Sequence, residues 1–365
     1  MQELKGDYTF LHLEHVRFGS GSIQRLADEV KALGGQRALV ITGNSLATKT
    51  DVIQQVTSLL GPLHAGTFAE IRQHAPKSGI VRAAEMARET NADILISVGG
   101  GSPIDAAKIV AHNLAQEGGA YLPQLAVPTT LSAAEFAHVA GMTEEEQNLK
   151  TGIADVQVAP RRVILDAALT LATPLQLWLS TGIRALDHAV ETLYAPGVHP
   201  INDLMALEAL RRLFLYLPLS KKQPNDLAVR TELQLAAWMS LFGNLNVRFG
   251  LSHNLGRYIG AKYGIPHGVT SCITLPTVMR TMAARNADQL AAIGRVLPLS
   301  YSGNDPQRMA MSAADAVESL IQQLGLAHRL LDFGIGEEDL PGIAAHAVEE
   351  PSQRTQVAEI LRQML

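Results

Sequence analysis

The chain has 365 residues, of which 47% are apolar and 18% are charged. This length exceeds one ordinary hydrophobic core, so we expect about two domains, and the composition is typical of a globular protein and excludes a disordered one. Thirty lysines and arginines against 35 aspartates and glutamates give a net charge of −5, which disfavours any general affinity for nucleic acid or for an anionic membrane.

The cysteine content and the N-terminus bear on the compartment. Cys272 is the single cysteine, which excludes an intramolecular disulfide and is typical of a reducing compartment. It lies in the apolar run "TSCITLP", so we interpret it as a buried structural thiol. The first residues show no cationic start followed by an apolar run, and no apolar stretch approaches the ~18 residues that span a bilayer. We therefore expect a cytoplasmic protein without a membrane partner.

The first ~165 residues alternate between two kinds of pattern. Short apolar and β-branched runs predict strands, and amphipathic patterns between them predict helices. The predicted strands cover 37–42, 64–70, 92–102 and 124–132, and the predicted helices cover 48–61, 78–91 and 103–116. Alternation at this spacing indicates βαβ units and a mainly parallel sheet, which is an α/β domain of the Rossmann type.

After the run at 161–174, the pattern changes to helix-period segments separated by Gly, Pro and Asn. Almost no strand signal follows from Leu175 onward, so the second half is predicted to be all-helical. We place an α/β domain at 1–165 and a helical domain at 166–365. The chain shows no internal repeat and no low-complexity tract.

The stretch "SVGGGSPIDAAK" carries the sharpest local signal. Gly99, Gly100 and Gly101 end a predicted strand, where bare backbone N–H groups can approach a phosphate and the next helix points its positive end at it. Ser102 can cap that helix, and Pro103 suits its first turn. The glycine spacing matches neither GxGxxG nor a P-loop, and a tight βα turn is the alternative interpretation. We favour pyrophosphate binding.

A second turn, "VPTTLSAAE", is rich in hydroxyl groups. Thr129, Thr130 and Ser132 suit turn and cap positions as well as ligand contacts. Paired with the glycine loop, they could line the other side of a bound nucleotide.

Histidines gather in two segments of the helical half. "GIRALDHAVE" places Arg184 and His188 at i and i+4 on one helix face, and "LSHNLGRYIGAKYGIPHG" carries His253 and His267. Fourteen residues of continuous helix rise roughly 21 Å, but the glycine and Pro266 before the last histidine predict a helix end and a reversal. One histidine on a helix is usually structural, whereas three in one domain suit Zn²⁺ or Fe²⁺, usually with a carboxylate as fourth ligand.

Together these segments resemble the iron-containing alcohol dehydrogenase superfamily, and more closely its maleylacetate reductase branch, over nearly the whole chain. "GGGSPIDAAK" fits the superfamily's GGGSxxDxxK nucleotide loop, "PTTLSAAE" its threonine turn, and the two histidine segments its metal-site segments. The resemblance implies a Rossmann-like domain followed by a helical domain, as in dehydroquinate synthase. It also implies NAD(P)H bound at the glycine loop, with Asp105 and Lys108 taking part, and an active site in the cleft between the domains.

The resemblance implies metal ligands at an aspartate, at a histidine four residues later and at two more histidines. His188, His253 and His267 match the histidines, but Arg184 stands at the aspartate position. A guanidinium is permanently charged and cannot ligate a cation, and a dication ~4 Å away would be repelled. Asp187 is a less favoured substitute ligand, because it lies ~100° around the helix from His188. A divalent metal is therefore doubted, in line with the metal-free catalysis ascribed to maleylacetate reductases.

Two further positions depart from the superfamily pattern. Arg257 stands where many members carry another active-site histidine, so Arg184 and Arg257 could grip a substrate carboxylate and polarise its carbonyl. The alternative is that one arginine makes a structural ion pair, for example Arg184 with Glu191. Gly43 ends the predicted second strand without the acidic residue that would repel a 2′-phosphate, so NADP(H) is allowed and NAD(H) is not excluded.

We therefore predict an NAD(P)H-dependent reductase of a small anionic carbonyl compound, an oxo acid such as maleylacetate, acting without a catalytic metal. Hydride would pass to the carbonyl carbon, an arginine would stabilise the oxyanion, and one of the three histidines would donate the proton. The alternatives are a metal-dependent alcohol or aldehyde dehydrogenase, an NAD-using lyase or cyclase on the same scaffold, and a catalytically silent nucleotide-binding protein. The resemblance also implies a homodimer.

Overall fold

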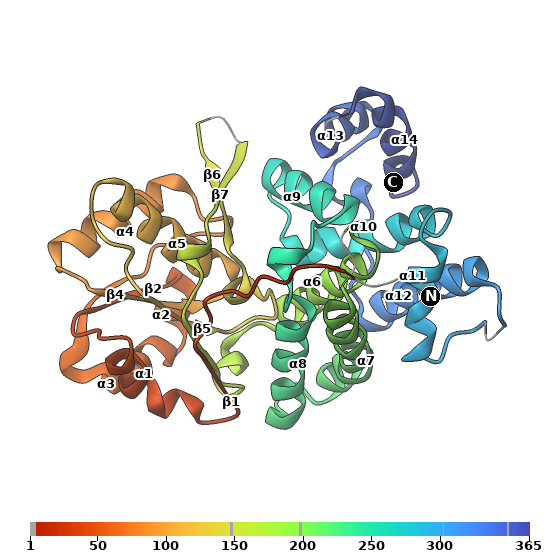
Figure 1. Ribbon diagram of the computed structural model, residues 1–365. Helices are drawn as coiled ribbons and strands as arrows, with labels where there is room; N and C mark the ends of the chain where they lie inside the picture. Colours follow the sequence, from red (N-terminus) through yellow and green to blue (C-terminus); the bar gives the residue numbers. More distant parts are fainter. Residues whose placement is uncertain (1–4, 147–148, 197–198, 302, 349) are drawn as a thin grey trace. The chain divides into compact units, whose positions relative to one another are not determined.

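The computed structural model describes residues 5–146, 149–196, 199–301, 303–348 and 350–365 (Figure 1). The chain divides into two compact units. We call the first, Leu11–Trp178 with Leu219–Gln234, the α/β unit, and the remainder the helical unit. Both are discontinuous in sequence. A division of the chain at 165/166 into two folding domains stays a prediction.

A six-stranded sheet forms the centre of the α/β unit. Its order is β1-β8-β5-β4-β2-β3, and every neighbouring pair is parallel. Strands β2, β4 and β5 are buried along their whole length, which explains their continuous apolar runs. The predicted parallel α/β fold is confirmed. The strands are β1 (His15–Phe18), β2 (Ala38–Ile41), β3 (His64–Phe68), β4 (Ile94–Gly99), β5 (Gln124–Pro128) and β8 (Arg162–Leu165).

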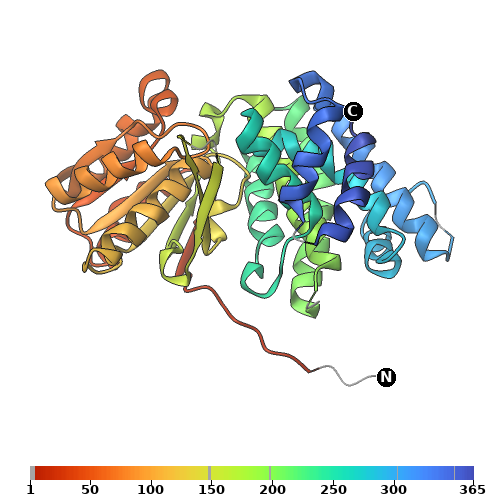
Figure 2. The same ribbon diagram turned by 90° about the horizontal axis from the view of Figure 1, so that it is seen from above.

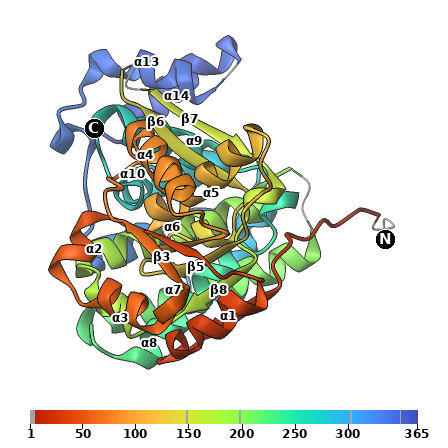
Figure 3. The ribbon, with the colours of Figure 1, turned by 90° about the vertical axis from the view of Figure 1, so that its left-hand side faces the viewer.

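Helices cover both faces of this sheet, as parallel strands require (Figure 3). One face packs against α1 (Leu26–Ala32) and α3 (Val52–Leu60), and the other against α4 (Lys77–Glu89) and α5 (Gly101–Gln116). The carboxyl ends of the strands, with the loops that follow them, therefore lie together along one edge of the sheet.

Two elements of the α/β unit differ from the sequence prediction. The single helix predicted at 48–61 is wrong, because α2 (Asn44–Lys49) and α3 are separate and Thr50 between them has extended backbone. The Thr50 hydroxyl bonds to the Leu46 carbonyl at 2.6 Å. An antiparallel hairpin of β6 (Val139–Glu144) and β7 (Leu149–Ala154) was not predicted, because its glycines and charged residues obscure any alternation.

After β8, the described residues contain helices and no strand, which confirms the all-helical second half (Figures 1 and 2). None of the described helices is both long and apolar enough to cross a bilayer. The helices are α6 (Leu175–Tyr194), α7 (Pro200–Lys222), α8 (Leu227–Ser240), α9 (Leu251–Tyr263), α10 (His267–Met282), α11 (Ala287–Ala291), α12 (Pro306–Leu324), α13 (Leu340–Ala347) and α14 (Pro351–Arg362).

A buried carboxylate ties α1 to the edge of the sheet. Glu29 accepts hydrogen bonds from Arg17 at 2.7 and 2.9 Å and from Arg162 at 2.5 Å, and it lies 3.0 Å from the His15 ring. Burial acts to raise the pKa of Glu29, but the hydrogen bonds from these three residues outweigh it and lower the pKa from 4.5 to about 2.

We predict that Glu29→Gln lowers the free energy of unfolding at pH 7 by about 2 kcal/mol, because it removes the anion that His15, Arg17 and Arg162 share and leaves Arg162 only its longer contact with Glu14. Since the folded-state pKa lies below the unfolded one, this stabilisation is present above pH 4.5 and is lost as the pH falls toward 2. Urea unfolding should show that the difference in free energy of unfolding between wild type and variant is smaller at pH 3 than at pH 7. Asp28→Asn, which breaks only an exposed pair, is the control. An equal gap at both pH values would contradict the assignment.

Candidate active site

A loop of three glycines joins β4 to α5. Gly99 has a φ of 138°, which is accessible to glycine alone, and Gly100 is the N-cap residue of α5, which begins at Gly101. A Cβ on Gly100 would lie 3.0 Å from the Thr130 side chain. The loop thus presents backbone N–H groups at a helix N-terminus with little room for a side chain at Gly100, which suits a phosphate group.

The predicted role of Ser102 as the helix cap is wrong. Gly100 is the N-cap residue, and the Ser102 hydroxyl instead accepts a hydrogen bond from the His74 backbone N–H at 3.1 Å. His74 has a left-handed φ of 62°. Ser102 therefore holds the loop that follows β3 against the start of α5.

The hydroxyl-rich turn lies directly beside the glycine loop. The Thr129 N–H donates to the Gly99 carbonyl at 2.8 Å, and the Thr130 hydroxyl lies 3.3 Å from that of Ser132. A Cβ on Gly101 would lie 3.4 Å from the Ser132 hydroxyl oxygen. The structure thus brings together the two segments that the sequence pairs as nucleotide-binding.

Asp105 and Lys108 lie behind the loop. The Lys108 ammonium is fully buried and donates to the carbonyls of Ala134 at 2.6 Å and Val139 at 2.9 Å, while Asp105 accepts from the Gly141 N–H at 3.1 Å. These bonds join α5 to the threonine turn and to the hairpin. Both residues therefore fix the position of these two segments relative to α5.

Glu135 is a buried carboxyl group that the sequence analysis did not single out. It is 2% exposed, Oε2 has no hydrogen-bond partner among the described residues, and burial raises the pKa to about 7 against the opposing charge of Lys108. The sequence feature that could have pointed to Glu135 is its place directly after the two alanines that end the hydroxyl-rich turn.

Gly43 lies where the ribose of a dinucleotide is expected in a Rossmann-like sheet. It follows β2 and is the N-cap residue of α2, and a Cβ there would lie 3.1 Å from the Ile71 carbonyl oxygen. No acidic residue occurs from Gly43 to Thr50. This end of β2 therefore offers no negative charge against a 2′-phosphate.

We predict that Gly43→Asp lowers the affinity for NADPH about tenfold more than the affinity for NADH, because a carboxylate there repels the 2′-phosphate. Gly43→Ala introduces the same crowding against Ile71 without the charge and is the matched control. Titration of both variants with each reduced cofactor, followed by fluorescence, measures the effect. Equal losses for both cofactors would contradict the placement of the ribose.

In the helical unit, α6 buries a run of polar residues in successive turns. Arg184, Asp187, His188 and Glu191 are all less than a tenth exposed. Buried charges are costly unless they are paired and hydrogen-bonded. The contacts of these four side chains therefore determine what the cluster can do.

The Arg184 guanidinium is held by two neighbouring helices and by its own. Nη1 lies 3.2 Å from Asp187 Oδ2 and 3.1 Å from the Ser271 hydroxyl, and Nη2 lies 2.6 Å from His253 Nδ1 and 3.1 Å from Nε2. Because one nitrogen approaches both ring nitrogens, the guanidinium lies against the imidazole. Arg184 does make an ion pair, but its partner is Asp187 and not Glu191.

Glu191 instead organises the start of α9. Its carboxyl oxygens accept from the backbone N–H groups of Gly250 at 2.8 Å and Ser252 at 2.9 Å, and from the Tyr194 hydroxyl at 3.2 Å. Burial raises the pKa of Glu191 to about 8, helped by the charge of Asp187. These contacts fix the helix turn that carries His253.

Two of the three candidate histidines lie close together. The ring centroids of His188 and His253 are 5.8 Å apart, and Phe249 stacks on His253 at 4.8 Å. Burial, with the charge of Arg184, lowers the pKa of His188 well below 6.5, so its imidazole is neutral at pH 7.

The third histidine follows the predicted reversal of the chain. Gly264, with a φ of 69°, ends α9, and Pro266 is the N-cap residue of α10, which starts at His267. The His267 ring packs against Gly260, where a Cβ would lie 3.4 Å from Nδ1. Gly260 lies two turns, about 10 Å along the helix axis, beyond His253.

The residues present do not fit a divalent metal ion. Among the described residues, no three His, Cys, Asp or Glu side chains are placed to hold one. A permanent positive charge lies 2.6 Å from His253, and Asp187 Oδ2 already accepts from three donors. A dication bound by His253 would meet the Arg184 guanidinium at close range, where like charges repel strongly.

Arg257 differs sharply from Arg184. It lies one turn after His253 on α9, is exposed, and makes no ion pair with any residue in the described ranges. Its guanidinium is therefore available to an anionic group from solvent.

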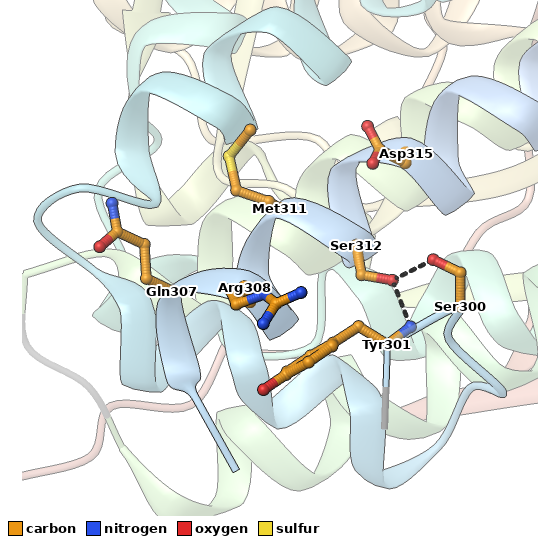
Figure 4. Close-up of a pocket in the computed structure, with 7 residues that line it drawn as sticks. All are labelled: Ser300, Tyr301, Gln307, Arg308, Met311, Ser312 and Asp315. Atoms are coloured by element: carbon orange, nitrogen blue, oxygen red, sulfur yellow. Dashed lines mark hydrogen bonds between the residues drawn. The ribbon is translucent and has the colours of Figure 1, made fainter. Parts of the chain in front are cut away.

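A cavity of about 400 Å³ lies elsewhere in the helical unit, at the start of α12 (Figure 4). It shares no residue with the cluster around Arg184, and the Ser312 hydroxyl on its wall already bonds to Ser300 at 2.7 Å. It is not the candidate active site. Its lining consists of Ser300, Tyr301, Gln307, Arg308, Met311, Ser312 and Asp315.

Comparison with known proteins settles the family. Residues 14–167 match the model of iron-containing alcohol dehydrogenases, and residues 178–365 match the C-terminal model of the same family. The chain belongs to the iron-containing alcohol dehydrogenase family. It lies in the maleylacetate reductase-like branch, and it is an NAD(P)-dependent oxidoreductase of a small molecule.

The chain is similar over nearly its whole length to several members. It is 32% identical over 355 residues to the maleylacetate reductase of Pseudomonas sp. strain P51, which covers 95% of this chain and 94% of that one. The maleylacetate reductase of Rhizobium sp. strain MTP-10005 superposes with a TM-score of 0.85 at 29% identity, covering 100% and 99% of the two chains. A 1,3-propanediol oxidoreductase superposes with a TM-score of 0.92 at 25% identity, covering 99% and 100%.

We predict that this protein, once purified, holds less than about 0.1 equivalent of zinc or iron, because the Arg184 guanidinium repels a bound dication. We also expect it to keep its activity after treatment with a chelator. Elemental analysis and activity assays before and after chelation check this. Arg184→Asp, which replaces the cation by a carboxylate beside His188 and His253, should raise the metal content. About one equivalent of metal in the wild type would contradict the argument.

Proposed function

We propose that this chain uses NAD(P)H to reduce a small oxo acid such as maleylacetate, with the fixed charge of Arg184 in place of a catalytic metal. The observation that carries the proposal is the buried Arg184 guanidinium, directed at His253 in the helical unit of an oxidoreductase. Relatives of the chain include a maleylacetate reductase at 32% identity, and arginine suits the carboxylates of an anionic substrate.

Arg184 stabilises the negative charge that develops on the substrate. NAD(P)H, held at the glycine loop, supplies the hydride when it is bound. A maleyl ketone conjugates its C=C bond with the carbonyl group, so hydride can enter at the carbonyl carbon or at the conjugated alkene carbon. In both cases negative charge develops on the ketone oxygen, and a fixed N–H donor beside that oxygen stabilises it. Product analysis after transfer of a deuteride label distinguishes the two carbons.

Arg257 and the histidines complete the proposed roles. The exposed Arg257 guanidinium binds a substrate carboxylate bidentately. His253 and His267 are both half-buried, so either can exchange protons with solvent and donate one to the substrate, whereas His188 lies deeper. We further propose that the protein is cytoplasmic and a homodimer.

We predict that His253→Ala and His267→Ala each lower kcat about 100-fold, while the affinity for NAD(P)H changes less than about threefold, because the histidines act on the substrate and not on the cofactor. Steady-state kinetics with a panel of oxo acids, and cofactor titration by fluorescence, check this. His328→Ala, at an exposed position in the helical unit, is the control.

Three outcomes would overturn the proposal. Unchanged turnover in both histidine variants would contradict the site. If the protein binds NAD(P)H but oxidises it with no oxo acid or aldehyde, it is a catalytically silent nucleotide-binding protein. If it converts substrate without net consumption of the cofactor, it is a lyase or cyclase.

A further inference from the structure

We propose that Asp187 is a positioning residue for the reduction, which holds the Arg184 guanidinium so that Nη2 faces His253 and the substrate oxygen. The inference rests on the proposed function of Arg184. It assigns to Asp187 a role through another residue and no contact with the substrate.

Asp187 lies where three helices meet. Its Oδ2 accepts from the Ser271 hydroxyl of α10 at 2.7 Å, from the Ser252 hydroxyl of α9 at 3.1 Å and from Arg184 Nη1 of α6 at 3.2 Å. The side chain is 1% exposed, and Oδ1 has no hydrogen-bond partner in the described ranges. Its position is thus determined from three sides.

The orientation of Arg184 follows from these bonds. A guanidinium is planar and rigid, so fixing one of its nitrogens limits where the others can point. Nη1 is held between Asp187 Oδ2 and the Ser271 hydroxyl, which leaves Nη2 directed at the His253 ring. The N–H donors on Nη2 therefore face the side of the cluster where His253 lies.

The charge balance points the same way. Arg184 is 7% exposed, and a buried cation needs an anion. The other buried carboxyl group on α6, that of Glu191, is engaged by the backbone of α9 and makes no ion pair with Arg184. Asp187 is the carboxylate that pairs with Arg184 in the described part of the chain. Without it, the guanidinium would lose its anchor and turn toward solvent.

A double-mutant cycle tests this role. Asp187→Asn keeps an oxygen acceptor for Ser252 and Ser271 but removes the charge that anchors Arg184. We expect it to lower kcat about 100-fold in the wild-type background and less than about twofold in an Arg184→Leu background, with KM for NAD(P)H unchanged in both. A role confined to joining the helices would give the same loss in both backgrounds, and that result would overturn the proposal.

Thr274→Ala is the matched control for the cycle. The Thr274 hydroxyl lies 2.8 Å from that of Ser252, so it belongs to the same buried network without touching Arg184. We expect its effect on kcat to be the same with and without Arg184. Thermal unfolding of each variant reports on folding, and a variant that does not fold at 25 °C is replaced by Asp187→Ser in the cycle.

Crystal structures of the wild type and of Asp187→Asn separate this inference from the proposed function. The proposal expects the guanidinium to leave His253 in the variant, and a guanidinium in its original place would overturn it whatever the activity. If the wild type reduces no oxo acid but the guanidinium moves, the positioning role stands and the proposed function fails. If the wild type is active and the two substitutions in the cycle have additive effects, the proposed function stands and the positioning role of Asp187 fails.

Discussion

A guanidinium buried among three helices constrains how α6, α9 and α10 pack together. Arg184 cannot relieve its burial by losing a proton, so the packing around it must supply an anion and further acceptors. Asp187, three residues later on α6, supplies the anion, and Ser271 on α10 supplies a hydroxyl. Ser252 on α9 completes the coordination of the same carboxylate oxygen. One charge pair thus joins α6, α9 and α10 at the place where His188 and His253 meet.

The same pair is the reason that we predict no bound metal at this place. A metal ion accepts electron pairs from several directions, so its histidine ligands alone can hold it. A guanidinium donates hydrogen bonds in one plane, so its usefulness depends on the acceptors that orient it. Asp187 Oδ2 is committed to three donors, and the His253 ring has a guanidinium against it. The cluster therefore carries one positive charge of fixed direction, which is the feature that the proposed function assigns to an anionic substrate.

The α/β unit differs, because its predicted phosphate site consists of backbone N–H groups. Its glycine loop leaves little room for a side chain at Gly100, and the buried Lys108 ammonium shapes the neighbouring turn through the carbonyls of Ala134 and Val139. The raised pKa of Glu135 follows from burial beside this network. Charges there act on the shape of the neighbouring turn, whereas in the helical unit the guanidinium of Arg184 is directed at the His253 ring.

The features that depend on sequence periodicity were predicted from the sequence. The features that depend on contacts between residues far apart in the chain were missed. The buried strands and the helical half follow from apolar patterns, and the reversal before His267 follows from Gly264 and Pro266. The hairpin at β6 and β7 carries no such pattern. The cap role of Ser102 failed because the backbone of His74, far away in sequence, takes its hydroxyl.

The partner of Arg184 shows the same limit most clearly. Helix spacing favours Asp187 at i+3 over Glu191 at i+7, but it does not say which groups of other helices bind either carboxyl group. The choice is made by α9, whose first backbone N–H groups take the Glu191 carboxylate and leave Asp187 for the guanidinium. Unpaired N–H groups at a helix start always need acceptors, and here that need decides which carboxylate orients the arginine. The pairing of Arg184 therefore depends on backbone N–H groups at the start of α9 as well as on the side chains of α6.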